Sequence, residues 1–184
     1  METRRRVSDV MSADALTTSP DTRLEEAAWL MREHHISGLP VVDPLHHVVG
    51  IVSESDIVRG LDRATGIESP RGLLDLLLAS APPRGESLLE VCRSHLKNAR
   101  VRDVMSRRVV TVDRDAPLAE AARRMRVNGV KRLPVVDTRG RLTGILTRAD
   151  IVQAVSGEVR VHRGALHPSV AGRPVPAAGP YEDV

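Results

Sequence analysis

Two segments of the chain place apolar residues with the 3.6-residue spacing of a helix that has one buried face. In the first segment the stripe is formed by Leu24, Ala27, Ala28, Met31 and His35. In the second segment the corresponding stripe is formed by Leu118, Ala121, Ala122 and Met125. Asp21 and Asp115 precede these stripes and are predicted to cap the helices, and Pro117 is tolerated in a first turn.

Short runs of β-favouring residues surround each predicted helix. The predicted strands cover residues 16–18, 39–43 and 48–52 in the first segment, and residues 109–112, 133–137 and 142–146 in the second. A further helix is expected to begin at Ser53 in the first segment and at Thr147 in the second. Each segment therefore predicts a β-α-β-β-α unit, an α+β fold with its helices on one side of a small sheet.

The two segments are copies of one another. Residues 7–58 and 101–152 align without a gap at a constant offset of 94 positions. A unit of about fifty residues exposes too much surface for its volume to be stable alone, so we expect the copies to share a core. We assign residues 1–58 to the first repeat and residues 101–156 to the second, packed as a pseudo-two-fold pair.

The rest of the chain forms a linker and a tail. Residues 59–100 contain leucine-rich stretches at 73–78 and 87–96, which predict a helical linker that packs on the repeats. Residues 157–184 are rich in Gly and Pro and show no periodicity, so we predict a mostly disordered tail.

Composition narrows the class of protein. Apolar residues make up 41% of the 184 positions, yet no run approaches the roughly twenty apolar residues needed to span a bilayer. The charged start METRRR is not followed by the apolar segment of a signal peptide. We therefore expect a cytoplasmic protein with no membrane partner.

The two repeats carry opposite charge. Residues 7–58 contain nine acidic residues against two arginines, a net charge of −7. Residues 101–152 contain twelve basic residues against six acidic ones, a net charge of +6. In a homodimer, Coulomb attraction over distances within about 8 to 10 Å would favour the head-to-tail arrangement, in which unlike repeats face each other, over the arrangement of like repeats.

One polar pair recurs where the last strand of each repeat meets its last helix: Ser53 with Asp56, and Thr147 with Asp150. The spacing [ST]-x-x-[DE] before an apolar run is typical of a capping box. The same geometry also suits a nucleotide. Free N–H groups at a helix N-terminus attract phosphate, the hydroxyl adds a donor, and the carboxylate can accept both ribose hydroxyls. Both interpretations stay open from the residues alone.

Catalysis and metal binding have no candidate residues. The chain lacks a Gly-rich phosphate loop, an H-E-x-x-H motif and a nucleophile elbow. The adjacent pairs His34-His35 and His46-His47 point apart on a helix or strand, so neither pair chelates a metal well. We expect a protein that is not an enzyme and has no metal or resident cofactor.

The repeated motifs carry a resemblance. A D-V-M-S opening, an L-P-V-V-D strand and a G-I-[VL]-[ST]-x-x-D junction occur in both repeats, and together they resemble a pair of cystathionine-β-synthase (CBS) domains, or Bateman module. The VKRLPVVD form of the second repeat is similar to bacterial proteins in which a CBS pair precedes a BON domain. The tail is too short for a BON domain, so the resemblance implies a stand-alone bacterial CBS pair.

The resemblance implies two nucleotide sites, each shared between the repeats. In such pairs the Asp holds ribose, the Ser or Thr helps to bind phosphate, and the segment before L-P of the other repeat contacts adenine. The expected first site consists of Ser53, Asp56, Val109, Val110, Val130, Lys131 and Arg132. The expected second site consists of Thr147, Arg148, Asp150, Ala15, Leu16, Ile36, Ser37 and Gly38.

The basic residues suggest that the sites differ. We expect Lys131 and Arg132 to give the first site a preference for di- or triphosphates, while the second tolerates AMP or S-adenosylmethionine. The chain has no Phe and only Trp29 and Tyr181, so adenine must pack on aliphatic side chains. Trp29 lies off the apolar stripe, at an interface or under the linker.

Three functions remain in competition. The first is a regulatory sensor of AMP, ADP, ATP or S-adenosylmethionine that acts through its oligomeric state or an unidentified regulated protein. The second is a dimerisation scaffold whose S/T-x-x-D motifs only cap helices. The third, nucleic-acid binding through the arginine-rich second repeat, is weaker because the first repeat is acidic and stacking aromatics are missing.

Overall fold

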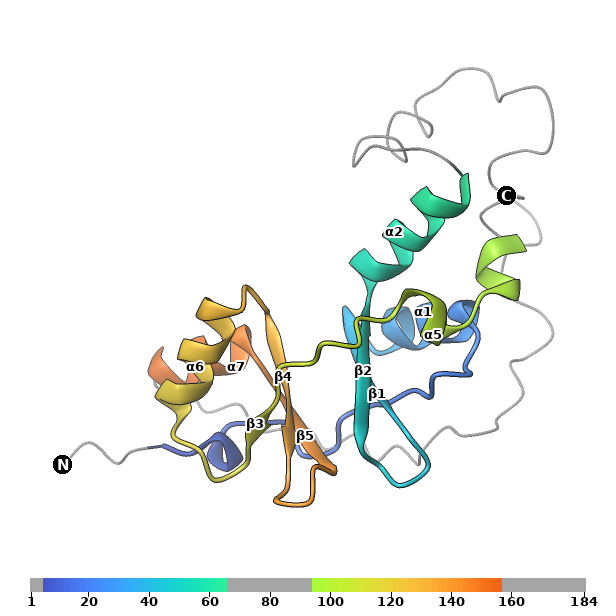
Figure 1. Ribbon diagram of the computed structural model, residues 1–184. Coiled ribbons are helices and arrows are strands. Elements are labelled where there is room, and N and C mark those ends of the chain that lie inside the picture. Colours follow the sequence, from blue (N-terminus) through green and yellow to red (C-terminus); the bar gives the residue numbers. More distant parts are fainter. Residues whose placement is uncertain (1–4, 66–93, 157–184) are drawn as a thin grey trace.

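The computed structural model describes residues 5–65 and 94–156 of the chain. These residues form two lobes, one built mainly from each repeat (Figure 1). Residues 94–98 are helical, while the expected helix at 73–78, residues 87–93 and the expected tail at 157–184 lie outside the described residues. None of the helices in the described ranges has the length and apolar character needed to cross a bilayer.

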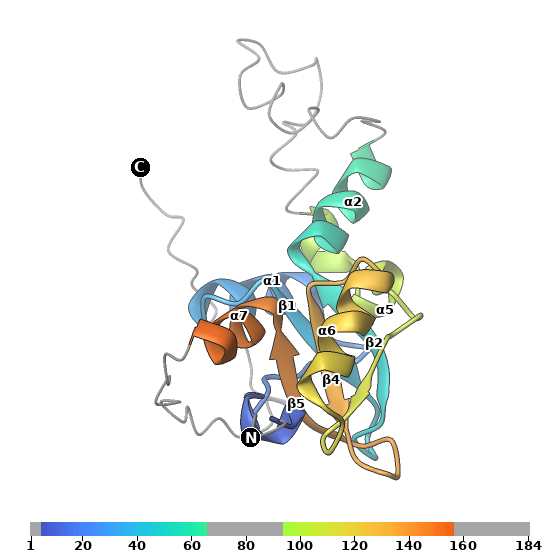
Figure 2. The same cartoon turned by 90° about the vertical axis from the view of Figure 1, so that its left-hand side faces the viewer.

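The first lobe contains a two-stranded sheet. Its elements are α1 (Leu24–Glu33), β1 (Gly38–Val42), β2 (Val48–Ser53), α2 (Glu54–Thr65) and α5 (Val101–Val104). Strand β1 pairs with β2 in antiparallel fashion, with Gly38 opposite Ser53 and Leu39 opposite Val52. All of β1 is buried, as expected of a strand covered on both faces. Helix α2 extends beyond the lobe at its C-terminal end (Figure 1, Figure 2).

The second lobe repeats this plan with one more strand. Its elements are η1 (Val7–Asp9), β3 (Val112–Asp113), α6 (Leu118–Val127), β4 (Arg132–Val136), β5 (Leu142–Thr147) and α7 (Arg148–Ser156). Strand β3 runs parallel to β4, and β4 runs antiparallel to β5 with Arg132 opposite Thr147. Helices α6 and α7 lie together on one side of the sheet (Figure 1). The mixed α+β class predicted from the sequence is confirmed.

The apolar stripes form the two cores. In the first lobe Leu24, Ala27 and Met31 of α1 are at most 2% exposed and pack with Leu39 and Val52. In the second lobe the counterparts from α6 pack with Leu133 and Leu146. The hairpin turns are alike, because Asp43 accepts hydrogen bonds from the amides of residues 45 and 47, and Asp137 from those of residues 139 and 141.

The repeats exchange their opening segments. Val7 of η1 is fully buried in the core of the second lobe, and its amide donates to the carbonyl of Ala116 at 3.0 Å. Val101 of α5 is fully buried in the first lobe, and its amide donates to the carbonyl of Thr22 at 2.9 Å. In Figure 1 the blue η1 accordingly lies beside β3. The packed lobe therefore differs from the contiguous sequence repeat, because each short unit completes its core with a segment of the other.

The predicted aspartate caps are wrong. The N-caps of α1 and α6 are Arg23 and Pro117, and neither makes a side-chain capping hydrogen bond. Asp21 instead forms an ion pair with Arg102, and Asp115 forms one with Arg6 at 3.5 Å. The partner arginines flank or belong to the exchanged segments, so these aspartates bind the exchanged segment rather than the helix N-terminus.

Two other local predictions need correction. Helix α1 ends at Glu33, and His35 is exposed with φ 51°, so this residue does not extend the buried stripe. The strand predicted at residues 16–18 is reduced to one parallel bridge between Thr18 and Val41. In the second repeat the equivalent strand is β3, which starts only at Val112.

Candidate functional site

The two S/T-x-x-D motifs lie where a strand passes directly into a helix. Ser53 is the last residue of β2, and Asp56 lies in the first turn of α2. The Asp56 carboxylate accepts hydrogen bonds from the Ser53 amide at 2.9 Å and from its hydroxyl at 2.6 Å. Thr147 and Asp150 make the same two bonds at 2.7 Å each. In both motifs the carboxylate thus satisfies the amide of the residue before the helix, which is one half of a capping box. At the second junction the Asp150 amide also donates to the Thr147 hydroxyl at 3.3 Å, which completes the box.

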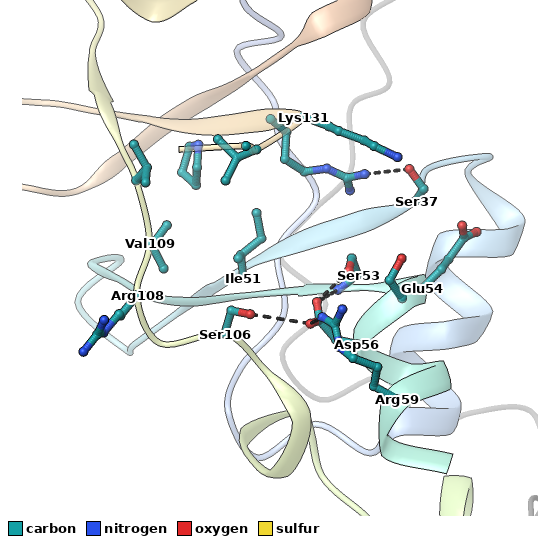
Figure 3. Close-up of a pocket in the computed structure, with 16 residues that line it drawn as sticks. Ser37, Ile51, Ser53, Glu54, Asp56, Arg59, Ser106, Arg108, Val109 and Lys131 are labelled. Atoms are coloured by element: carbon teal, nitrogen blue, oxygen red, sulfur yellow. Dashed lines mark hydrogen bonds and ion pairs between the residues drawn. The ribbon is translucent and has the colours of Figure 1, made fainter. Parts of the chain in front are cut away.

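Each junction also faces a cavity between the lobes. The first cavity, of about 390 Å³, lies in front of Ser53 and Asp56 (Figure 3). The second, of about 900 Å³, lies in front of Thr147 and Asp150. These aspartates are almost fully buried, at 5% and 9% exposure, and each lines its cavity with the small part that remains exposed.

The structure brings the predicted residues of each site together across the repeats. Opposite the first junction the cavity is lined by Val109, Val110, Val130, Lys131 and Arg132. Opposite the second junction, which includes Arg148, the cavity is lined by Ala15, Leu16, Ile36, Ser37 and Gly38. The segment before L-P of one repeat thus faces the S/T-x-x-D junction of the other. The roles of these residues in binding a ligand stay predictions.

The assignment of Lys131 and Arg132 to the first site alone is wrong. Both residues line both cavities, and Ser37 does so as well. Arg132 donates from Nη2 to the Ser37 hydroxyl at 2.6 Å, the bond that ends at Ser37 in Figure 3. The reason is the fold, because β1 and β4 begin side by side at the boundary between the cavities.

Gly38 makes room for this arginine. Gly38 and Arg132 are counterparts under the 94-residue offset. A Cβ atom on Gly38 would lie 2.1 Å from Nη1 of Arg132 and 2.8 Å from the carbonyl oxygen of Val52. The guanidinium therefore occupies the space that a side chain at position 38 would need.

Among the residues of the first cavity that were not predicted from the sequence are Arg59, Ser106 and Arg108. Arg59 forms an ion pair with Asp56, and the Ser106 hydroxyl donates to the same carboxylate at 3.5 Å. The i,i+3 spacing of Asp56 and Arg59 on a helix could have indicated the ion pair. Ser106 and Arg108 follow the exchanged segment α5 along the chain. The repeat pattern does not reveal that this segment packs on the first lobe.

The second cavity also contains acidic residues that were not predicted, Asp9 and Asp14. Asp9 reaches it because η1 packs on the second lobe, and Asp14 follows on the same stretch of chain. Asp14 is the counterpart of Arg108, so this position carries opposite charge in the two cavities.

The two cavities therefore differ in charge. The first is lined by four basic and two acidic side chains. The second is lined by three of each, together with His34 and His35. Burial lowers the pKa of the half-buried Arg132 guanidinium, while the carboxylates of Glu54 and Asp56 act in the opposite sense. An arginine remains protonated, so Arg132 carries its charge at the boundary.

Nothing in the described ranges resembles a metal centre. Among residues 5–65 and 94–156, no group of three or more His, Cys, Asp or Glu side chains lies close enough together to hold a metal ion.

Comparisons with known proteins agree on one family. The model of the CBS domain matches residues 7–63 and 101–157. An uncharacterised protein of the archaeon Methanocaldococcus jannaschii is 38% identical over 154 residues, which cover 81% of this chain and 90% of that protein. Because this relative is archaeal, it does not support the expected bacterial assignment.

Two solved structures with similar folds contain adenosyl ligands. A crystal structure of CBSX2, a CBS-pair protein from Arabidopsis thaliana, in complex with AMP is 30% identical with a TM-score of 0.60 and covers 83% of this chain and 96% of that one. The CBS domain pair of protein MJ0100 in complex with 5′-methylthioadenosine and S-adenosylmethionine is 25% identical with a TM-score of 0.59. It covers 82% of this chain and 99% of that one.

Proposed function

The chain belongs to the CBS domain family, and from that premise we propose that it is a nonenzymatic regulatory module that binds adenine nucleotides or adenosyl compounds between its repeats. One observation carries the proposal. Each S/T-x-x-D junction opens onto a cavity whose far wall is the segment before L-P of the other repeat. The AMP bound to CBSX2 and the adenosyl compounds bound to MJ0100 support this ligand class.

In the first cavity the ligand would lie with its phosphates toward the N-terminus of α2. The N-terminal end of the helix dipole attracts anions, and Arg59, Arg108, Lys131 and Arg132 add positive charge. The ribose hydroxyls would donate to Asp56, and Arg59 would turn from that carboxylate to the phosphates. The adenine would pack on Val109, Val110 and Val130. We infer a preference for di- and triphosphates at this site.

In the second cavity the balance of charge favours ligands with fewer phosphates. Asp9 and Asp14 lie among its lining residues, where carboxylates attract an ammonium or sulfonium group and repel a triphosphate. The cavity is also more than twice as large as the first. We infer that it binds AMP or S-adenosylmethionine, with the ribose on Asp150.

Regulation follows from the position of both ligands between the lobes. A ligand that contacts both lobes changes their packing only to the extent that it binds one arrangement more tightly than another. The readout would be an oligomer or a partner protein. Exposed apolar residues on the helices offer a surface for it, including Trp29 on α1 at 42% exposure and Val127 on α6 at 68%. With the opposite charges of the repeats, we propose a head-to-tail homodimer.

Thermal unfolding with ATP, ADP, AMP and S-adenosylmethionine tests the function. A ligand that binds only the folded protein at about 100 times its Kd adds about 2.7 kcal/mol per site, which raises Tm by roughly 5 to 10 °C. Asp56→Asn and Asp150→Asn form a matched pair that keeps the size of the cap while weakening the ribose contact. Each variant should lose the stabilisation by one class of ligand.

The second candidate is a scaffold without a ligand. It is favoured by the capping bonds, because these account for Ser53, Asp56, Thr147 and Asp150 with no nucleotide. On this alternative no compound of the panel raises Tm, and the two Asn variants change only the stability of the free protein. A flat response to all four ligands would therefore replace the sensor by the scaffold.

A further inference from the structure

One charged side chain lies on the boundary between the two cavities. Arg132 lines both of them, half-buried at the start of β4. Its resting partner is a neutral hydroxyl, that of Ser37, which also lines both cavities. Because its counterpart is Gly38, no second side chain of this kind faces it from the first repeat. The pair of sites has one guanidinium at its boundary, not two.

We propose that Arg132 is a phosphate-binding side chain shared by the two sites, so that a phosphorylated ligand in one cavity weakens the binding of phosphate in the other. This inference rests on the proposed function. It adds that the sites are coupled, that the coupling is negative, and that it is carried by one residue.

The chemistry of arginine supports an exclusive choice. A guanidinium binds phosphate most strongly through two parallel N–H bonds in one plane, so a bidentate contact orients the group toward one cavity. The bond to a neutral hydroxyl is weaker than a charge-assisted bond to phosphate, so either ligand can displace Ser37. The site that loses Arg132 keeps its other cations but has one fewer positive charge near its phosphates. Repulsion between the two anionic ligands acts in the same direction.

The neighbouring lysine provides a matched control. Lys131 also lines both cavities, but it is exposed and its ammonium is a compact charge on a flexible stem. Lys131→Gln removes the same charge from the same boundary as Arg132→Gln. If coupling comes from the shared guanidinium, only the arginine variant abolishes it. If it comes from the general positive field, both variants reduce it equally.

The test is calorimetric titration of the full chain with AMP, the phosphorylated ligand that both sites are expected to accept. Asp56→Asn and Asp150→Asn give the intrinsic Kd of the remaining site in each case. In the unsubstituted chain the second binding step should be weaker than the corresponding intrinsic value by at least about fivefold, within the usual range of coupling between sites. In Arg132→Gln, the Kd of the second binding step should equal the intrinsic Kd, which is again measured with Asp56→Asn or Asp150→Asn added. In Lys131→Gln, the second step should remain weaker than the intrinsic Kd. Adenosine, which has no phosphate, should bind to both sites without coupling.

Every result of these titrations supports or overturns the shared arginine. A second step equal to the intrinsic Kd, or tighter, overturns the shared arginine and leaves the nucleotide sensor standing. Equal loss of coupling in the lysine and arginine variants, or coupling with adenosine, also overturns it. Absence of binding by every adenine compound overturns the sensor and this inference together.

Discussion

The two strand-to-helix junctions share one backbone and one capping pattern, yet they face cavities of different character. At both junctions an aspartate accepts hydrogen bonds from the amide and hydroxyl of the residue three positions earlier. Beyond these atoms the repeats differ. Asp56 has Arg59 as an ion-pair partner, and the counterpart of Arg59 is Gln153. Arg108 of the first cavity corresponds to Asp14 of the second.

The hydrogen bonds shared by the two junctions belong to the fold of the repeat, whereas the charged residues around them distinguish the two sites. Hydroxyl and carboxylate recur because, at both junctions, the carboxylate satisfies the amide of the residue where the strand passes into the helix. The charged residues around this pair differ in sign between the repeats, as Arg108 and Asp14 do. Substitutions at counterpart positions test this difference between the repeats.

The exchange of opening segments is tested by Val7→Ala and Val101→Ala. Each substitution should lower the free energy of unfolding by about 2 kcal/mol, because a fully buried side chain loses two methyl groups and leaves a cavity. Hydrogen exchange should locate the damage in the lobe of the other repeat: in α6 and β3 for Val7→Ala, and in α1 for Val101→Ala. The exposed Val155→Ala is the control, with a change within about 0.5 kcal/mol. Loss of protection in α1 after Val7→Ala would contradict the exchange.

The charge difference between the sites is tested by exchanging one pair of counterparts. Arg59→Gln should weaken ATP at the first site about tenfold, or 1.4 kcal/mol, because a charge-assisted contact to phosphate is lost. AMP should be affected less. The reverse change, Gln153→Arg, should not improve ATP binding by a similar factor, because Gln153 does not line the second cavity. Titration of both variants with ATP and AMP measures these ratios, and an unchanged ATP affinity in Arg59→Gln would remove this arginine from the site.

The opposite charge of the repeats is tested through assembly. In a Cys92→Ser background, Trp29→Cys and Arg123→Cys place thiols at counterpart positions on the exposed faces of α1 and α6. A mixture of the two single variants should form mixed disulfides in excess over those between like variants if unlike repeats face each other. The excess should fall as salt is raised from about 0.01 M to 1 M, because screening shortens the Debye length from about 30 to 3 Å. Preferential cross-linking between two copies of the Trp29→Cys variant would contradict the head-to-tail dimer.

A counterpart pair of glutamates should respond in opposite senses to pH. Hydrogen bonds from Arg123 and Arg124 lower the pKa of Glu120 from 4.5, whereas burial raises the pKa of Glu26, against the attraction of Arg23. Ionised Glu120 therefore stabilises the fold above pH 4.5, and this contribution is lost as pH falls through its lower folded-state pKa. Ionised Glu26 destabilises the fold at neutral pH, and this cost disappears as pH falls through its raised pKa.

Two substitutions measure this difference. At about pH 7, Glu120→Gln should lower Tm slightly and Glu26→Gln should raise it slightly, and below about pH 3 both differences should shrink. Thermal melts of the two variants across this range provide the measurement. Shifts of the same sign in both variants at neutral pH would contradict the opposite environments of the two carboxyl groups.

Much of the fold and of the site follows from local patterns. The apolar stripes predict α1 and α6, the L-P-V-V-D runs predict β1 and β4, and the S/T-x-x-D spacing predicts a cap at each junction. The resemblance to CBS pairs then places the two sites between the repeats. Residues 16–18 show the limit of such patterns, because a short β-favouring run forms a strand only when a neighbouring strand is in register with it.

Contacts between distant segments could not be predicted in this way. Asp21 and Asp115 read as helix caps, but their partners are Arg102 and Arg6, which lie far from them along the chain. Lys131 and Arg132 read as residues of one site because the sequence places them before one L-P segment. The starts of β1 and β4 meet at the boundary of both cavities, and this shared edge is a property of the packed pair.

The repeat, most of its helices and strands and the chemistry of the two junctions follow from local sequence patterns, because hydrophobic periodicity and capping act over a few residues. The packing of the whole chain, in contrast, sets which repeat completes which core and places Arg132 over Gly38 and against Ser37. Two copies of one repeat can pack in several ways, and the choice among them depends on apolar surfaces and charges of segments that lie far apart in the sequence. The two sites therefore differ because counterpart positions, which lie at nearly the same place in each repeat, carry different residues.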